Sequence, residues 1–405
     1  MRKEFITLLL CLLPYASGYE IAPITPDMET AADEIISYLL PPTGVTQSSS
    51  VAWSRLAYIC DTFGPRFSGS DALESALDYI RDTATTDGLR VTEQFTMVPR
   101  WVRGEEWAYM LSPRKKKLHM VGLGMSNSSH GQNITASVFV VSDNDDLQAN
   151  CTKAAGKIVL FNTIFTTYGN TVPTRTNAAI WAASCNAKAA LIRSIAPFSM
   201  QNPHTGYSVT GTIPAAAVSL EDASQMKRMQ DRGQDIIVSL YMDNHLYPES
   251  QSRNLLIDLV GTELPEEYVL VSGHGDSWDI AEGAMDDGGG FMTSWEAVRV
   301  MKQLGLTPRR TVRAVVWVNE ENGDAGGVQY MVDGIANNTL WNHSIAIETD
   351  EGSFEPLGLS VNCANVSNGG CALAIQQLEV LSPLLDTIGG GRVVEGGTGA
   401  DIDPM

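Results

Sequence analysis

The chain has 405 residues, of which 44% are hydrophobic and 18% charged. This balance favours one large or two smaller globular domains over a disordered chain. Its formal net charge of −20 argues against a nucleic-acid partner, because binding phosphates requires a basic face.

The first residues predict a secretory leader over 1–18 that is removed from the mature chain. Arg2 and Lys3 form a charged start, residues 5–13 an apolar centre, and 16–18 a small-residue cleavage site. No run reaches the ~18 uninterrupted apolar residues of a membrane span, so we expect none. Six N-x-S/T sequons agree with secretion or delivery to the lysosome, and we expect glycosylation at Asn127, Asn133, Asn150, Asn337, Asn342 and Asn365.

Five cysteines follow the leader, and an odd number leaves at least one unpaired or paired between chains. Cys363 and Cys371 are close enough in sequence for a local disulfide. None of the five has the spacing of a cysteine zinc site.

The elements expected in the first part of the chain change character near residue 126. Apolar residues at helical spacing predict two helices around residues 56–60 and 73–80, and residues 90–125 alternate as strands do. Over 126–245 we expect a β-rich insert with strands at 134–141, 157–161 and 236–242 and helices at 177–191 and 220–231. Ser219 can cap the second of these helices. The domain that the insert interrupts then comprises 19–125 and 246–405.

From residue 254 onward strands and helices alternate. We expect strands at 268–273, 311–318 and 344–349, and helices at 290–306 and around 327–332. Such alternation predicts an α/β fold with a mostly parallel sheet and helices on both faces.

Acidic and imidazole groups follow each of these three strands. The first strand ends at His274 and Asp276, the second at Glu320-Glu321, and the third at Glu348 and Asp350. The loop after the first strand adds Asp286-Asp287 among glycines. Because ligands of open α/β sheets bind outside the carboxyl ends of the strands, we expect these groups to converge.

So many carboxylates at one place repel one another unless they bind a cation. One imidazole with several carboxylates suits zinc, and this number of ligands fits two ions better than one. Alone, Asp-Asp-Gly is more often a turn and Glu-Glu a solvated helix start. The metal hypothesis rests on their coincidence at successive strand ends, where one glutamate can bind metal and the other act as general base.

The motifs "SGHGDSWD", "GAMDDGGG", "VNEENG" and "IETDEGSF" resemble the metal motifs of secreted two-zinc metallo-exopeptidases. The segments "DTFGPRFSGS" (61–70), "AALIRSIAPFSM" (189–200) and "PHTG" (203–206) extend the resemblance over roughly residues 50–405. It implies a zinc aminopeptidase-like peptidase domain, with residues 126–245 similar to the protease-associated insert of that family. It also implies a homodimer that hydrolyses dipeptides or terminal residues of short peptides.

The resemblance implies a role for each site residue. His274 and Asp350 match the ligands of one zinc, and Asp286 matches the bridging carboxylate, followed by a strained peptide bond to Asp287. Glu321 matches a ligand of the second zinc. Glu320 matches the general base for a metal-activated water, and Asp276 matches the residue that orients the site.

One departure from the family concerns the end of the chain. The family has a further histidine ligand for the second zinc late in the sequence, whereas no histidine follows His343 here. We therefore expect the peptidase domain, 246–405, to lack its C-terminal end. An inactive secreted homologue that acts as a binding protein is the alternative function. A single-zinc acyl-transfer enzyme of the glutaminyl cyclase type is a third, which the Glu320-Glu321 pair and the insert disfavour.

Overall fold

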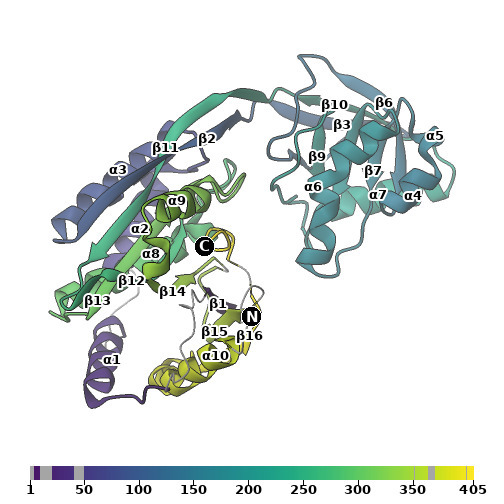
Figure 1. The fold of residues 1–405 in the computed structure, drawn as a ribbon. Coiled ribbons are helices and arrows are strands. Elements are labelled where there is room, and N and C mark those ends of the chain that lie inside the picture. Colours follow the sequence, from purple (N-terminus) through teal and green to yellow (C-terminus); the bar gives the residue numbers. More distant parts are fainter. Residues whose placement is uncertain (1–3, 10–20, 41–49, 351, 364–369, 398) are drawn as a thin grey trace. The chain divides into compact units, whose positions relative to one another are not determined.

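A computed structural model describes residues 4–9, 21–40, 50–350, 352–363, 370–397 and 399–405. They form two compact units, of which unit 1 comprises Met1–Val98 and Glu249–Met405 and unit 2 comprises Pro99–Pro248. The strands β2 (Arg90–Val102) and β11 (His245–Leu259) each continue from one unit into the other (Figure 1).

Unit 1 is built on an eight-stranded mixed sheet in the order β16-β15-β1-β14-β12-β13-β11-β2. Besides β2 and β11, its strands are β1 (Glu4–Leu9), β12 (Leu264–His274), β13 (Arg310–Trp317), β14 (His343–Glu348), β15 (Pro356–Asn362) and β16 (Arg392–Glu395). The central strands β13, β12 and β14 are parallel, whereas β11 runs antiparallel to β13. His274 lies opposite Trp317, and Ser272 lies opposite Glu348, so three strand ends meet at one edge.

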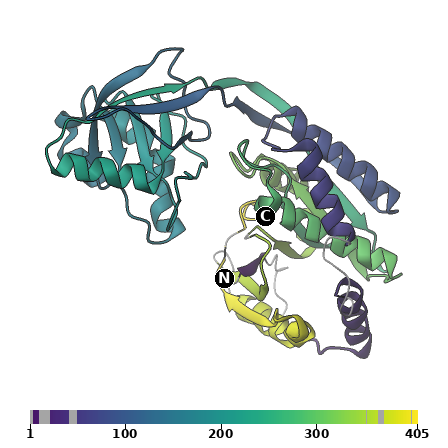
Figure 2. The same ribbon diagram turned by 180° about the vertical axis from the view of Figure 1, so that it is seen from behind.

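Helices cover both faces of this sheet, as the alternation of strands and helices predicts (Figures 1 and 2). The helices of unit 1 are α1 (Pro26–Leu39), α2 (Val51–Phe63), α3 (Asp71–Thr86), η2 (Ala284–Gly288), α8 (Gly289–Gln303), α9 (Ala325–Ala336), η3 (Leu340–Asn342), α10 (Gly370–Leu381) and η4 (Ser382–Ile388). Val316 of β13 belongs to the core formed with α2, α3 and α8, and its neighbour Trp317 packs on the other face with Tyr330 of α9. Side chains of one strand alternate between two buried faces, which confirms the expected α/β architecture.

Unit 2 has its own eight-stranded sheet, in the order β4-β3-β10-β6-β7-β8-β9-β5. Its strands are β3 (Glu106–Ser112), β4 (Lys116–Lys117), β5 (Met120–Gly122), β6 (Ile134–Val141), β7 (Ile158–Phe161), β8 (Ala189–Arg193), β9 (Ala215–Val218) and β10 (Ile237–Met242). Its helices are α4 (Asn144–Ala149), α5 (Cys151–Ala154), α6 (Tyr168–Ser184) and α7 (Leu220–Asp231). Residues 99–125, assigned from sequence to the first part of the peptidase domain, fall in unit 2 because β3 pairs with β10.

Two local predictions in unit 2 have different outcomes. Ser219 caps α7 as expected, because its hydroxyl accepts a hydrogen bond from the backbone N–H of Asp222 at 3.1 Å. The helix expected at 177–191 is confirmed over 177–184, where α6 lies, but its last part is wrong, because α6 ends at Ser184 and residues 189–193 form the strand β8. Alanine favours helices, but β8 is buried between β7 and β9, where tertiary packing outweighs the local propensity.

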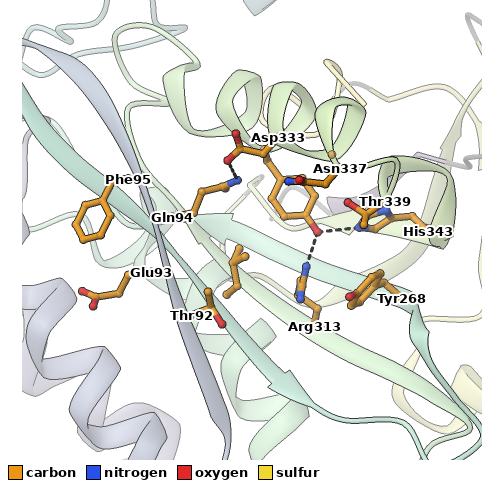
Figure 3. Close-up of a pocket in the computed structure, with 13 residues that line it drawn as sticks. Thr92, Glu93, Gln94, Phe95, Tyr268, Arg313, Asp333, Asn337, Thr339 and His343 are labelled. Carbon is orange, nitrogen blue, oxygen red and sulfur yellow. Dashed lines mark hydrogen bonds between the residues drawn. The ribbon is translucent and has the colours of Figure 1, made fainter.

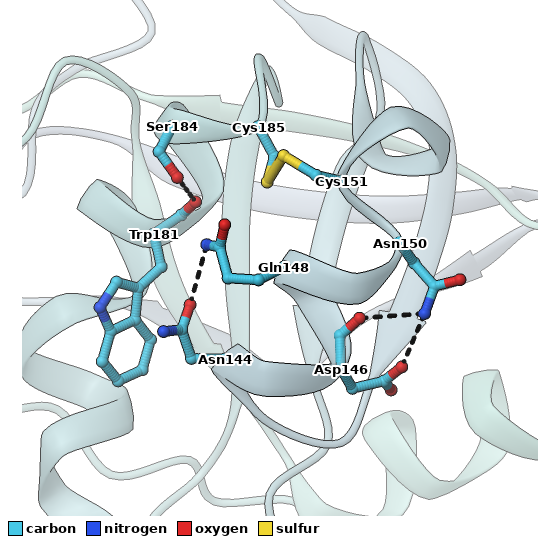
Figure 4. Close-up of a disulfide and its surroundings, with 8 residues drawn as sticks. All are labelled: Asn144, Asp146, Gln148, Asn150, Cys151, Trp181, Ser184 and Cys185. Atoms are coloured by element: carbon cyan, nitrogen blue, oxygen red, sulfur yellow. Dashed lines mark hydrogen bonds between the residues drawn. A yellow bond between two sulfur atoms is a disulfide. The ribbon is translucent and has the colours of Figure 1, made fainter.

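Two disulfides are present among the described residues. Cys151–Cys185 joins the start of α5 to the end of α6 (Figure 4), and the sequence did not indicate this pair. Cys363–Cys371 joins the two cysteines that lie close in sequence. Cys60 is buried and unpaired, in agreement with the odd count.

Most of the expected leader and one expected glycosylation site lie outside the described residues. Of the expected leader, only residues 4–9 are described, as the strand β1 between β14 and β15, and residues 1–3 and 10–18 lie outside the described ranges. Asn365 also lies outside them. Within those ranges, no helix is both long and apolar enough to cross a bilayer.

Candidate metal centre

The imidazole of His274 is the centre of the acidic cluster. His274 is fully buried at the end of β12, and its Nε2 lies 3.2 Å from an Asp350 oxygen and 3.3 Å from an Asp286 oxygen. An oxygen of Glu320 lies 3.7 Å away. His274, Asp286 and Asp350 each offer one ligand atom, and the three atoms lie within 4.8 Å of one another.

Backbone geometry fixes which nitrogen of this imidazole carries a proton. The Nδ1 of His274 lies 2.9 Å from the backbone carbonyl oxygen of Asp276. A carbonyl oxygen can only accept, so Nδ1 is the donor. Nε2 faces three carboxylates, so it either carries a proton itself or, in the neutral imidazole, offers its lone pair to a cation that these carboxylates also bind.

The two residues of the Asp286-Asp287 pair have different surroundings: Asp286 faces His274, whereas Asp287 is bonded to the backbone. Asp286 has a side chain that is 68% exposed and faces His274. Asp287 is fully buried and accepts hydrogen bonds from the backbone N–H groups of His274 and Gly290, both at 3.0 Å. The peptide bond between the two residues is cis. A Cβ on Gly290 would lie 1.8 Å from the carbonyl oxygen of Thr349, so glycine permits this close approach.

The carboxylate of Asp276 holds the segment that carries the glutamate pair. One oxygen accepts from the N–H groups of Asn319 at 2.8 Å and Glu320 at 3.3 Å. The other accepts from the N–H of Glu321 at 3.3 Å and from the Ser68 hydroxyl at 2.9 Å. Asp276 thus acts through its backbone on the His274 ring and through its side chain on residues 319–321.

The two glutamates take different environments, as adjacent side chains after a strand should. Glu320 faces the His274 ring, whereas an oxygen of Glu321 accepts from the backbone N–H of Trp278 at 3.2 Å. Glu321 lies outside the group of three ligand atoms around His274. Its assignment to a second ion therefore stays a prediction, and so does the assignment of Glu320 as general base.

Sequence reasoning missed the residues that hold the loop 275–283. Arg66 is fully buried, and its guanidinium donates to the carbonyl oxygens of Gly275 at 3.0 Å, Glu282 at 2.8 Å and Gly283 at 2.9 Å. The ring of Phe67 lies against Trp278 with centroids 4.9 Å apart. The segment "DTFGPRFSGS" supplied the resemblance, but only the three-dimensional contacts reveal what it does.

Glu348 and Asp401 form a second pair of buried acids near the metal centre. Glu348 accepts from the backbone N–H of Ile402 at 3.1 Å, and burial raises the pKa of Glu348 to about 7. Asp401 is fully buried, and burial followed by the charge of Glu348 raises the pKa of its carboxyl. Glu348 thus holds the last turn of the described chain against β14.

The electrostatics of the cluster favour a cation. Burial raises the pKa of Glu320 to about 8, and it raises the pKa of Glu321, with Asp286 adding to the rise. For His274 burial lowers the pKa, but Asp350 and Asp286 outweigh it and leave that pKa well above its ordinary value. Burial and the neighbouring negative charges raise the pKa of both glutamates, and the attraction of those same charges for the imidazolium raises the pKa of His274. Imidazole nitrogen with carboxylate oxygen is a donor set that zinc binds, so these residues fit that ion.

Comparison with known proteins agrees with this geometry. The profile of peptidase family M28 matches residues 254–361, which include all the predicted metal ligands. Carboxypeptidase Q of Bos taurus is 41% identical over 406 residues, which cover 97% of this chain and 84% of that protein. Carboxypeptidase Q of Homo sapiens is 42% identical over 357 residues, covering 87% and 74%. The chain belongs to the carboxypeptidase Q family of M28 peptidases.

Solved structures share the fold of this family member. A peptidase M28 precursor from Shewanella amazonensis superposes with a TM-score of 0.82 at 28% identity, covering 92% of this chain and 84% of that one. A zinc aminopeptidase from Bacillus subtilis superposes with a TM-score of 0.60 at 20% identity, covering 87% and 81%. The family inferred from the motifs is thereby confirmed, and the chain is a metallo-exopeptidase, a hydrolase of peptide bonds.

Proposed function

We propose that this chain is a secreted, zinc-dependent exopeptidase that hydrolyses dipeptides or removes terminal residues from short peptides. The observation that carries the proposal is the His274 Nε2 that faces Asp286 and Asp350, with Glu320 beside it. The relatives named carboxypeptidase Q support peptide substrates. The donor set supports zinc, in agreement with the Bacillus subtilis aminopeptidase of the same fold.

We assign one zinc to His274, Asp286 and Asp350, and a second zinc to Asp286 and Glu321. When bound, zinc provides a Lewis acid and lowers the pKa of water at the site. Asp276 keeps the Nδ1 of His274 protonated through its carbonyl oxygen, which leaves Nε2 free to bind metal. The Trp278 N–H holds Glu321 in place.

Glu320 is the residue placed to move the proton. Its carboxylate accepts a proton from the attacking water and delivers it to the leaving amine as the peptide C–N bond breaks. The products are a carboxylate and an amine, so the reaction consumes one water and no other reactant. The Asp276 carboxylate fixes the backbone of Glu320 and so the direction from which the base approaches.

Replacement of Glu320 tests the assignment. Glu320→Gln keeps the shape of the side chain and removes the base, so we expect kcat on dipeptides to fall by about 10²–10⁴-fold with zinc content unchanged. Glu263→Gln, a change at the exposed partner of Arg309, is the control and should leave kcat intact. If the unaltered chain binds peptides with zinc present but hydrolyses none, the alternative of an inactive binding homologue takes the place of this proposal.

The number of zinc ions, the secretory route and the oligomeric state need separate measurements. Elemental analysis should give two zincs per chain, and a value of one would remove the second ion. We also propose that the chain enters the secretory pathway and forms a homodimer. Glycopeptide mass spectrometry and light scattering of the purified protein test these two points.

A further inference from the structure

Unit 1 has a cavity whose lining includes none of the predicted metal ligands. This cavity, of about 380 Å³, lies where the C-terminal end of α9 meets β2 (Figure 3). Tyr268 lines it, and Tyr268 precedes His274 on β12 by six residues, or about 20 Å of strand. The volume is at the lower end of the range of about 300–1,000 Å³ typical of small-molecule sites. The cavity therefore has room for a small ligand.

Two lining residues belong to one glycosylation sequon. Asn337 and Thr339 are its first and third residues, and both line the cavity. The Asn337 N–H donates to the Asp333 carbonyl at 2.9 Å, and the Thr339 N–H donates to the Gly334 carbonyl at 2.8 Å. This turn, with Asn338 at a φ of 55°, ends α9 and fixes the sequon at the edge of the cavity. Asn337 is exposed, so a group attached to its amide has space beside the protein.

The wall opposite the sequon is the strand β2, whose side chains alternate between its two sides. Phe95, which is 52% exposed, projects away from Asn337, whereas Gln94 and Thr92 project towards it (Figure 3). Gln94 donates to the Asp333 carboxylate at 2.6 Å, and Thr92 adds a hydroxyl. A hexose presents hydroxyls at the edge of its ring, and the hydroxyl, amide and carboxylate groups of this wall match that edge.

We propose that this cavity seats the first sugar of an N-linked glycan attached to Asn337. The proposal rests on the secretory route proposed above, because glycans are added there. A covalent tether raises the local concentration of the sugar to the millimolar range, so contacts too weak to hold a free sugar suffice. The seated sugar joins the end of α9 to β2 and stabilises the glycosylated form of unit 1.

The test uses the full chain produced in a eukaryotic secretory host and trimmed by an endoglycosidase to one N-acetylglucosamine per site. Mass spectrometry of glycopeptides gives the occupancy of Asn337. Asn337→Gln is compared with Asn133→Gln, the matched change at an exposed sequon of unit 2. We expect Asn337→Gln to lower the Tm by about 3 °C, the change that corresponds to a sugar found in the cavity several times more often than outside it. Asn133→Gln should change the Tm by less than about 1 °C.

Two further measurements separate the sugar from the side chain. Without glycosylation, Asn337→Gln should leave the Tm unchanged, and Thr92→Val, which removes a hydroxyl that lines the cavity, should reduce the difference that the sugar makes. Equal Tm values for the two glutamine variants at full occupancy of Asn337 would overturn the proposal. An unoccupied Asn337 beside occupied sequons elsewhere would also overturn it while leaving the secretory route intact. Absence of glycan from every sequon would contradict the secretory route itself.

Discussion

The hydroxyl of Ser68 offers a specific test of how the metal centre is held. Ser68 is 1% exposed and donates to a buried oxygen of Asp276 at 2.9 Å. Ser68→Ala removes this donor with little change in volume, and the N–H groups of residues 319–321 remain bonded to the same carboxylate. A hydrogen bond to a charged group contributes about 1.5–3 kcal/mol, so we expect the free energy of unfolding to fall by about 2 kcal/mol.

The same substitution should weaken metal binding. Because Asp276 sets the His274 ring and the backbone of the glutamate pair, loss of one of its partners should lower zinc affinity by about 10-fold. Urea denaturation of the metal-free chain gives the first quantity, and competition with a fluorescent chelator gives the second. Ser75→Ala, on the exposed face of α3, removes a hydroxyl bonded only to the backbone of its own helix and is the control. If Ser68→Ala matches this control in both assays, Asp276 does not depend on Ser68 and the reasoning is refuted.

Three further changes test other parts of the structure. Arg66→Met should lower the free energy of unfolding by about 4 kcal/mol in urea, because three carbonyls of the loop 275–283 lose a charged donor, and Arg66→Lys should recover part of the loss. Replacing both Cys151 and Cys185 by serine opens a loop of sequence separation 34 and should cost unit 2 about 3 kcal/mol, seen as faster hydrogen exchange there. Burial lowers the pKa of His343 from 6.5 to about 4, so the unfolded chain takes up this proton first as the pH falls. Stability should be complete above pH 6.5 and decline by up to about 3 kcal/mol towards pH 4, and a Tm series with His343→Gln should lack this part of the decline.

The sequence predicted the parts of this molecule that depend on short-range pattern. Alternation of strands and helices after residue 254 indicated the sheet, and the acidic residues at three strand ends indicated where ligands meet. His274, Asp286 and Asp350 do converge. The strand β8 was read as helix because alanine carries little information about burial in a parallel sheet.

The residues that support the site could not be found in this way. Ser68 and Arg66 contact partners more than 200 positions away, and neither belongs to a periodic pattern. Cys151 and Cys185 are joined because the start of α5 lies beside the end of α6, which spacing alone does not show. Long-range pairing of buried polar groups is a property of the fold, and a single sequence does not record it.

The double role of Asp276 has a consequence for which substitutions the site can tolerate. Its side-chain oxygens receive four donors, two on each side, and a carboxylate is the short group that offers acceptors in both directions. Asparagine has the same shape, but its NH₂ group would meet N–H or O–H donors on one side. The contact to His274 uses the backbone carbonyl, which every residue type retains. Changes at position 276 can therefore disturb the glutamate pair while the imidazole keeps its protonation, so the two halves of the centre are chemically separable.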